Sequence, residues 1–122
     1  MQQGYFCLLQ FRPAPEREEG RNVAVVVFDT QGRLVVRALE KLSSVLHALN
    51  IPEQDLPWVE QDLSAYLTRL AHTEPSVTAL RHFAACEAGQ LVLLEPHSTS
   101  FEDIGQEADT LFQQLVQPPY DS

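Results

Sequence analysis

The sequence predicts an α+β domain in which a largely antiparallel sheet of about four strands is covered by helices. Three observations support this fold class. Short apolar runs with strand character stand together at the start of the chain, the apolar period changes from two to a helical one near Leu39, and the elements follow the order β-β-β-α-α-α-β-α. Strands grouped before helices, instead of strictly alternating with them, are typical of antiparallel α+β sheets.

The first three elements are predicted strands. Residues 4–11 (GYFCLLQF) form a short apolar and aromatic run, and residues 22–29 (NVAVVVFD) contain consecutive valines, whose branched side chains favour a packed, pleated surface. Residues 29–32 (DTQG) supply a turn in which Gly32 takes a positive φ. Residues 33–38 (RLVVRA) follow, so the last two runs predict a β-hairpin.

The middle of the chain predicts three helices that supply one wall of the core. In residues 39–50 apolar side chains recur at spacings of three and four, and Asn50 ends the helix. A second helix begins near Asp55, with Pro57 in its first turn. Ser76 caps a third, whose apolar residues face inward.

The C-terminal part predicts one more strand and one more helix. Residues 90–95 (QLVLLE) form a short apolar run. Ser100 and Asp103 have the spacing of a capping box, and the helix that follows carries apolar residues on one face as far as Val116. Two prolines then stop the helix, so residues 118–122 are expected to form a short flexible tail.

Length and composition predict a single domain over residues 1–117, because 122 residues suffice for one core and not for two. No apolar run approaches the ~18 residues that span a bilayer, and the N-terminus lacks the charged region and apolar block of a leader peptide. Cys7 and Cys86 stand in no metal or redox motif, which favours two small buried hydrophobes over a disulfide or zinc site. We expect a soluble, cytoplasmic protein without a cofactor.

The acidic side chains are unevenly distributed along the chain. Residues 1–41 hold six of the eight basic side chains against five acids, whereas residues 42–122 hold two basic side chains against twelve acids. The formal net charge of −9 makes direct binding to nucleic-acid phosphates unfavourable, and no membrane contact is expected. The acidic part is interpreted as a solvated helical surface, and the alternative is a patch that meets a basic partner.

A polar cluster precedes the valine strand and is the first candidate binding site. We interpret it mainly as structural, with Arg17 paired to a carboxylate and Asn22 hydrogen-bonded to loop backbone so that the loop keeps one shape. The functional alternative is a polar rim that grips a partner or an anionic ligand. Its members are Arg12, Arg17, Glu18, Glu19, Arg21 and Asn22.

No catalytic constellation is recognisable in the sequence. The histidines form neither an i, i+4 pair nor an HExxH motif, and no serine stands in an elbow or P-loop context. Carboxylates at strand ends, from Glu18 to Asp29 and at Glu95, leave open a metal-dependent nuclease or hydrolase, because oxygen-rich clusters hold Mg²⁺. No metal ligand set is predicted.

The stretch 13–28 (PAPEREEGRNVAVVVF) resembles the N-terminal signature of the DUF3037 family, a bacterial and phage domain of unknown function. The family pattern runs roughly Pro-Asp-Pro-x-Arg-x-Glu-x-x-Asn-Val-Gly-Val before an apolar strand. Residues 91–116 are also similar to the closing segment of that family. Nearly the whole chain is therefore consistent with one such domain.

The resemblance carries over to particular positions. Four residues match the motif and two depart from it, with Ala14 where an acid is usual and Ala24 where a glycine is usual. Ala24 implies that the backbone there does not require a positive φ. The resemblance also implies a partner, a HipA-like kinase, because members of the family are often encoded beside one. The matching residues are Pro15, Arg17, Glu19 and Asn22.

Our leading hypothesis is a non-enzymatic protein-interaction or regulatory module that works with a protein partner. Trp58, in the first turn of a predicted helix, is a candidate anchor for that contact if it is exposed, since tryptophan is enriched at interface hot spots. Two alternatives stay open. One is the metal-dependent nuclease or hydrolase, and the other is an acidic nucleic-acid mimic that binds a DNA-binding protein.

Overall fold

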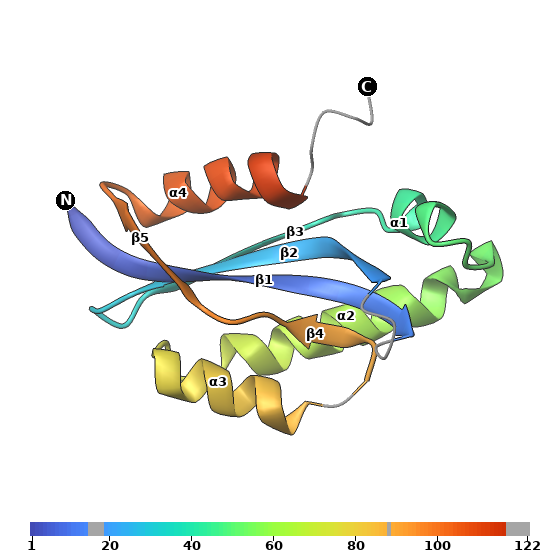
Figure 1. The fold of residues 1–122 in the computed structure, drawn as a ribbon, viewed down its shortest axis with the longest axis horizontal. Helices are drawn as coiled ribbons and strands as arrows, with labels where there is room; N and C mark the ends of the chain where they lie inside the picture. The colour runs from blue at the N-terminus through green and yellow to red at the C-terminus, as the bar shows by residue number, and fades with distance from the viewer. Residues whose placement is uncertain (15–18, 88, 117–122) are drawn as a thin grey trace.

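The computed structural model describes residues 1–14, 19–87 and 89–116, with Glu19 described only in its backbone, and contains a five-stranded sheet with helices on both faces (Figure 1). The strands are β1 (Gln2–Ala14), β2 (Glu19–Asp29), β3 (Leu34–Ala38), β4 (Leu91–Leu93) and β5 (His97–Phe101). The helices are α1 (Ser43–Ala48), α2 (Leu56–Ala71), α3 (Val77–Cys86) and α4 (Ile104–Leu111). A 3₁₀ turn, Glu53–Asp55, precedes α2, and a π-helical turn, Phe112–Val116, follows α4.

Every strand pairing in the sheet is antiparallel. The order is β3-β2-β1-β4, and β5 pairs with the N-terminal half of β1 on the same side as β4. The predicted fold class, an antiparallel α+β domain, is confirmed. One edge of the sheet is formed by β3 and the other by β4 and β5. No further described strand pairs with either edge.

The fifth strand corrects the expectation for residues 97–101. Ser100 pairs with Gln3 in the sheet, so it does not cap the last helix. The cap is Asp103, whose carboxylate accepts a hydrogen bond from the Gln106 N–H at 3.0 Å. The reason is that β1 extends back to Gln2 and offers its backbone groups to this segment, which a local capping pattern does not reveal.

Strand β2 is buried on both faces. Val26 and Phe28 pack into the larger core cluster beneath α1, α2 and α3, whereas Val25 and Val27 pack into a second cluster beneath α4. Figure 1 shows α4 on one side of the sheet and α2 and α3 on the other. The continuous valine run therefore marks a strand that is covered twice.

The first helix is shorter than the predicted span 39–50. The Leu39 N–H donates to the carbonyl of Val23 at 2.9 Å, which continues the strand pairing, so the helix begins only at Ser43. Asn50 has a φ of 58° and ends the helical segment as expected.

The other two predicted helices of this wall are largely confirmed. Pro57 lies in the first turn of α2, although the Asp55 side chain makes no capping bond, and the Ser76 hydroxyl accepts from the Ala79 N–H at 3.1 Å. None of the described helices is both long enough and apolar enough to cross a membrane.

The two cysteines differ from each other. Cys7 is fully buried in β1, as predicted, and burial, with the charge of Glu95, raises its pKa to about 12. The prediction was wrong for Cys86, which is exposed at the end of α3 with its Sγ 3.5 Å from Nε2 of His82. Residues 82 and 86 lie one turn apart on the outer face of the helix, which explains both the exposure and the contact.

The β2–β3 hairpin closes around the carboxylate of Asp29, which is only 2% exposed. Its Oδ1 accepts from the backbone N–H groups of Gln31 and Arg33, both at 2.9 Å, and its Oδ2 pairs with Nε of Arg33 at 2.6 Å. Burial alone would raise the pKa of Asp29, but the hydrogen bonds and the charge of Arg33 outweigh it and lower the pKa. Gly32 completes the turn with the predicted positive φ.

Replacing Asp29 by asparagine is expected to lower the free energy of unfolding at about pH 7 by about 2 kcal/mol, because bonds to a charged group contribute roughly 1.5–3 kcal/mol. The ionised carboxylate stabilises the fold fully above its ordinary pKa of 3.8, and this stabilisation is lost as the pH falls through the lower pKa of the folded state. The difference between wild type and Asp29→Asn should therefore shrink on acidification. Urea unfolding from about pH 7 to about pH 2 measures both effects.

Thr30→Ala, at an exposed position of the same turn, is the matched control and should change the free energy of unfolding by less than about 0.5 kcal/mol. A deficit of Asp29→Asn that stays constant down to about pH 2 would contradict the role of the ionised carboxylate.

Candidate functional site

Three of the sequence-predicted site residues meet at the junction between β1 and β2. Nε of Arg12 donates to Oε1 of Gln10 at 2.9 Å, Nε2 of Gln10 donates to Oδ1 of Asn22 at 2.9 Å, and Nδ2 of Asn22 donates to the carbonyl of Leu115 at 2.8 Å. Arg21 is exposed, and its guanidinium donates to the carbonyl of Gly20 at 3.3 Å. We call these five residues, Gln10, Arg12, Gly20, Arg21 and Asn22, the polar junction.

A β-bulge explains why Asn22 reaches the C-terminal segment. Leu9 pairs with Ala24 and Gln10 pairs with Asn22, so Val23 is an extra residue on β2. In a regular strand, Asn22 would point to the same face of the sheet as Ala24. The bulge turns its side chain to the opposite face, where α4 and its π-helical turn lie. The predicted bond from Asn22 to loop backbone is therefore corrected, since the bond joins β2 to the turn after α4.

The remaining motif residues contribute less to the described geometry. Pro15, Arg17 and Glu18 lie outside the described residues, and Glu19 begins β2 with only its backbone described, so the predicted ion pair of Arg17 is not part of this geometry. Gly20 lies in close contact with β1, because an added Cβ would stand 2.9 Å from the carbonyl oxygen of Phe11. Ala24 is fully buried without a positive φ, as the sequence implied.

A cavity of about 460 Å³ opens beside the polar junction. It is lined by Gln10, Arg21 and Asn22 and, from α1 and the C-terminal turn, by Ser44 and Leu115. The described lining contains no Asp, Glu, His or Cys, so it offers hydrogen-bond donors and one cation without a general base or a metal ligand. Such a lining is suited to holding a polar group and not to transferring its protons.

The acids that the sequence left open for a metal are held apart. Glu19 and Asp29 stand at opposite ends of the eleven-residue strand β2, roughly 33 Å apart at about 3.3 Å per residue. The oxygens of Asp29 are engaged by the hairpin, and Glu95 pairs with Arg81. Within residues 1–14, 19–87 and 89–116 no three His, Cys, Asp or Glu side chains gather in a possible metal site.

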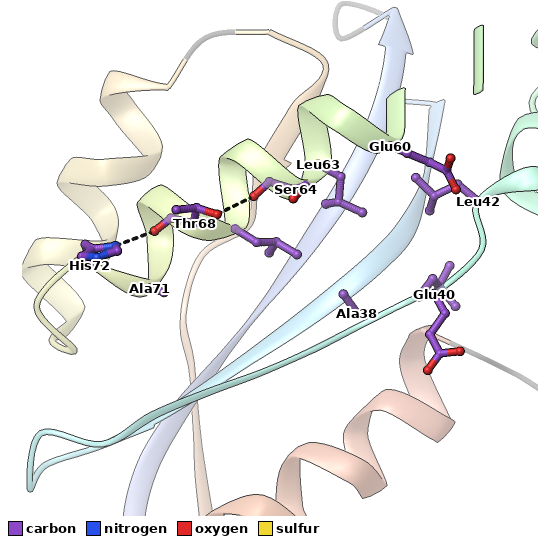
Figure 2. A pocket seen from close by; sticks show the side chains of 11 residues that line it. Ala38, Glu40, Leu42, Glu60, Leu63, Ser64, Thr68, Ala71 and His72 are labelled. Atoms are coloured by element: carbon purple, nitrogen blue, oxygen red, sulfur yellow. Dashed lines mark hydrogen bonds between the residues drawn. The ribbon is translucent and has the colours of Figure 1, made fainter. Parts of the chain in front are cut away.

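A second hollow, which we call the α2 groove, lies between α2 and the end of the edge strand β3, and it measures about 490 Å³ (Figure 2). Its apolar surface comes from Leu63 and Leu67 of α2 and from the segment after β3, chiefly Leu39 and Leu42. The exposed carboxylate of Glu60 stands on its rim, whereas Glu40 lines the groove with its carboxylate turned toward α4 (Figure 2).

Two polar groups on the α2 wall of the groove are bonded within the helix. The Thr68 hydroxyl donates to the carbonyl of Ser64 at 2.9 Å, and Nδ1 of His72 lies 2.8 Å from the carbonyl of Thr68 (Figure 2). These contacts leave the leucines and the exposed side chain of Ser64 as the available surface of this wall. The groove is not predictable from the sequence, because it depends on α2 and β3 being neighbours. In the structure Leu67 is half-buried, whereas Leu63 and Leu70 of the same helix are buried.

Trp58 lies in the first turn of α2 and is 57% exposed. Its interpretation as an anchor residue depended on such exposure. It is not part of the groove's lining. Helix α2 therefore presents two separate apolar features to solvent, the leucine wall of the groove and the indole of Trp58. An exposed tryptophan supplies a large contact area with few rotatable bonds.

Comparison with known proteins gives one match. Residues 6–116 match a family model whose description reads "Protein of unknown function (DUF3037)", a range that includes the polar junction and both walls of the α2 groove. No curated protein and no solved structure matches the chain. The resemblance predicted from residues 13–28 is confirmed.

Replacing Asn22 by alanine should lower the free energy of unfolding by about 1–3 kcal/mol, because it leaves both Gln10 and the Leu115 carbonyl without their partner in a partly buried place. Hydrogen exchange should also speed up in the turn Phe112–Val116, since that turn loses its bond to the sheet. Chemical denaturation and amide exchange measure the two effects.

Arg21→Ala is the control, because the side chain is exposed and, among the described residues, bonds only within its own strand. It should shift stability by less than about 0.5 kcal/mol and leave the exchange in that turn unchanged. Equal effects of the two substitutions would argue against Asn22 as the link between β2 and the C-terminal turn.

Proposed function

The chain belongs to the DUF3037 family, and we propose that it is a protein-interaction module without catalytic activity of its own, which receives its partner in the α2 groove. The observation that carries this proposal is the open apolar groove of about 490 Å³ beside an exposed strand edge. Concave apolar surface that stays open to solvent is characteristic of binding sites.

The chemistry of the described surface supports binding over catalysis. The groove's lining has leucines, the hydroxyls of Ser64 and Thr68, two carboxylates and one histidine, and among the described contacts no hydrogen bond joins either hydroxyl to the histidine or to a carboxylate. The polar junction offers donors without a base. Neither place brings a nucleophile and a base together, which an acyl- or phosphoryl-transfer site requires.

The partner we propose to test first is a HipA-like kinase, which the family resemblance implied. The cytoplasmic setting expected from the sequence belongs to the same proposal, and two free thiols, Cys7 and Cys86, are compatible with a reducing compartment. The metal-dependent hydrolase and the acidic mimic remain hypotheses drawn from the sequence.

Leu67→Gln should abolish stoichiometric co-purification of the partner, because it places an amide on the apolar wall of the groove. The experiment co-expresses the tagged chain with a HipA-like kinase and measures the mass of the purified complex. Ala65→Gln, an exposed position two residues away and outside the groove's lining, is the matched control and should retain the complex. Recovery of no stoichiometric partner, together with substrate turnover by the pure protein, would refute the proposal.

Trp58→Ala tests the second apolar feature of α2 separately. If the partner also covers the indole, affinity should fall by about tenfold or more, the cost of removing a hot-spot tryptophan. Titration calorimetry on the same complex gives the ratio of dissociation constants. An unchanged constant would limit the interface to the groove.

A further inference from the structure

We propose that the occupant of the α2 groove is an extended segment of the partner that adds to β3 as a sixth, antiparallel strand, with apolar side chains toward α2 and basic residues at its ends. This inference rests on the proposed function and specifies how the partner binds. It is carried by the open backbone edge of β3, by hollows on both faces of that edge, and by the charge around them.

The backbone of β3 has free hydrogen-bonding groups on its outer side. The bonds from the Asp29 N–H to the Arg33 carbonyl and from the Leu39 N–H to the Val23 carbonyl show that odd-numbered residues bond to β2. In an antiparallel pair the intervening residues then point their N–H and C=O groups outward. These are Leu34, Val36 and Ala38.

The outward groups are only partly occupied. Among the described residues, Nη1 of Arg37 donates to the carbonyl of Val36 at a long 3.2 Å, and no other hydrogen bond to the outer backbone groups of these three residues is found. An edge with unpaired donors and acceptors is a template for a further strand, and an antiparallel one matches the rest of this sheet.

Hollows flank the edge on both faces of the sheet. The α2 groove lies on one face, and a second hollow of about 550 Å³ lies on the α4 side, lined by Arg37, Lys41, Asp109 and Phe112 among others. The two share Ala38, Leu39 and Glu40. Figure 2 shows this stretch running between α2 and α4.

An added strand would place its side chains alternately in the two hollows, because successive residues of a strand point to opposite faces. β3 itself follows this rule, with Val36 packed against the α1–α3 core and Val35 against the α4 core. Apolar residues of the segment therefore meet Leu63 and Leu67. Polar residues between them meet the α4 side, where Arg37 and Asp109 already pair at 2.7 Å.

The negative charge of the groove and of the whole chain favours a basic partner segment. Glu40 and Glu60 line the α2 groove and are exposed, and the lining contains no arginine or lysine. The whole chain carries a net charge of −9, so a second copy would be repelled whereas a basic segment would be attracted. Lysine or arginine at the ends of the segment is attracted both by these carboxylates and by the net negative charge of the chain.

The probe is a fluorescein-labelled peptide of sequence KVTVTVK, whose valines face α2 and whose lysines share the opposite face with the threonines, where Glu40 also lines the hollow. Fluorescence anisotropy with the full chain should show saturable binding. In an antiparallel pairing the valine amides bond to β3 and the threonine amides point away, so N-methylation of the valines should abolish binding while N-methylation of the threonines leaves it unchanged. The acidic twin EVTVTVE should bind about tenfold or more weakly.

Three variants of the chain locate the site. Ser64→Lys puts a cation on the exposed wall of the groove and should weaken binding about tenfold or more, whereas Ala65→Lys, with the same charge change outside the lining, should weaken it less than about threefold. Ala38→Pro removes an outward N–H without removing a bond to β2 and should abolish binding. Amide spectra of each variant confirm that it is folded.

Several results would overturn the inference: no saturable binding of KVTVTVK, equal loss with both N-methylated peptides, equal effects of the two lysine variants, or concentration-dependent dimerisation through β3. The proposed function has a separate readout. If the partner complex is lost with Leu67→Gln but retained with Ala38→Pro, the groove binds a partner in another manner and only the strand addition is wrong. If no partner complex forms at all, the proposed function itself fails.

Discussion

Strand β2 is buried on both of its faces, and this burial explains the arrangement of the other elements. Its four central residues alternate between two apolar clusters, so both faces of the sheet must be removed from water. One helix, α4, covers one face, and three helices cover the other. The chain must therefore return to the sheet after α3, and β4 and β5 accomplish this by pairing with the free side of β1 before α4 crosses to the other face.

Covering both faces leaves the edges open. Because α2 and α4 lie on opposite sides of β3, the edge strand runs between two hollows, one apolar with an acidic rim and one of mixed charge. The proposed interaction uses features that this layered arrangement already provides, namely a row of outward backbone groups, the partly exposed Leu67 of α2, and a net negative charge. A binding surface of this kind requires no catalytic residue.

The β-bulge at Val23 explains the structural role of Asn22 in the family signature. The bulge turns Asn22 toward the C-terminal turn, and the chain of bonds from Arg12 through Gln10 to Asn22 connects the start of the domain with its end. A polar residue next to a valine run would otherwise point into the larger core without a partner. The motif thus joins the two layers, while the groove, far from the motif in sequence, offers the surface for a partner.

The fold class, the hairpin at Asp29 and Gly32, the caps at Asn50 and Ser76, and membership in the family were predictable from the residues, because each depends on neighbouring residues or on a contiguous motif. Three features were not predictable in this way: residues 97–101 form a strand, Cys86 is exposed, and Asn22 bonds to Leu115. The groove that α2 and β3 enclose also depends on the tertiary structure. Each of these depends on which distant segment supplies the partner atoms, and local periodicity carries no information about that pairing.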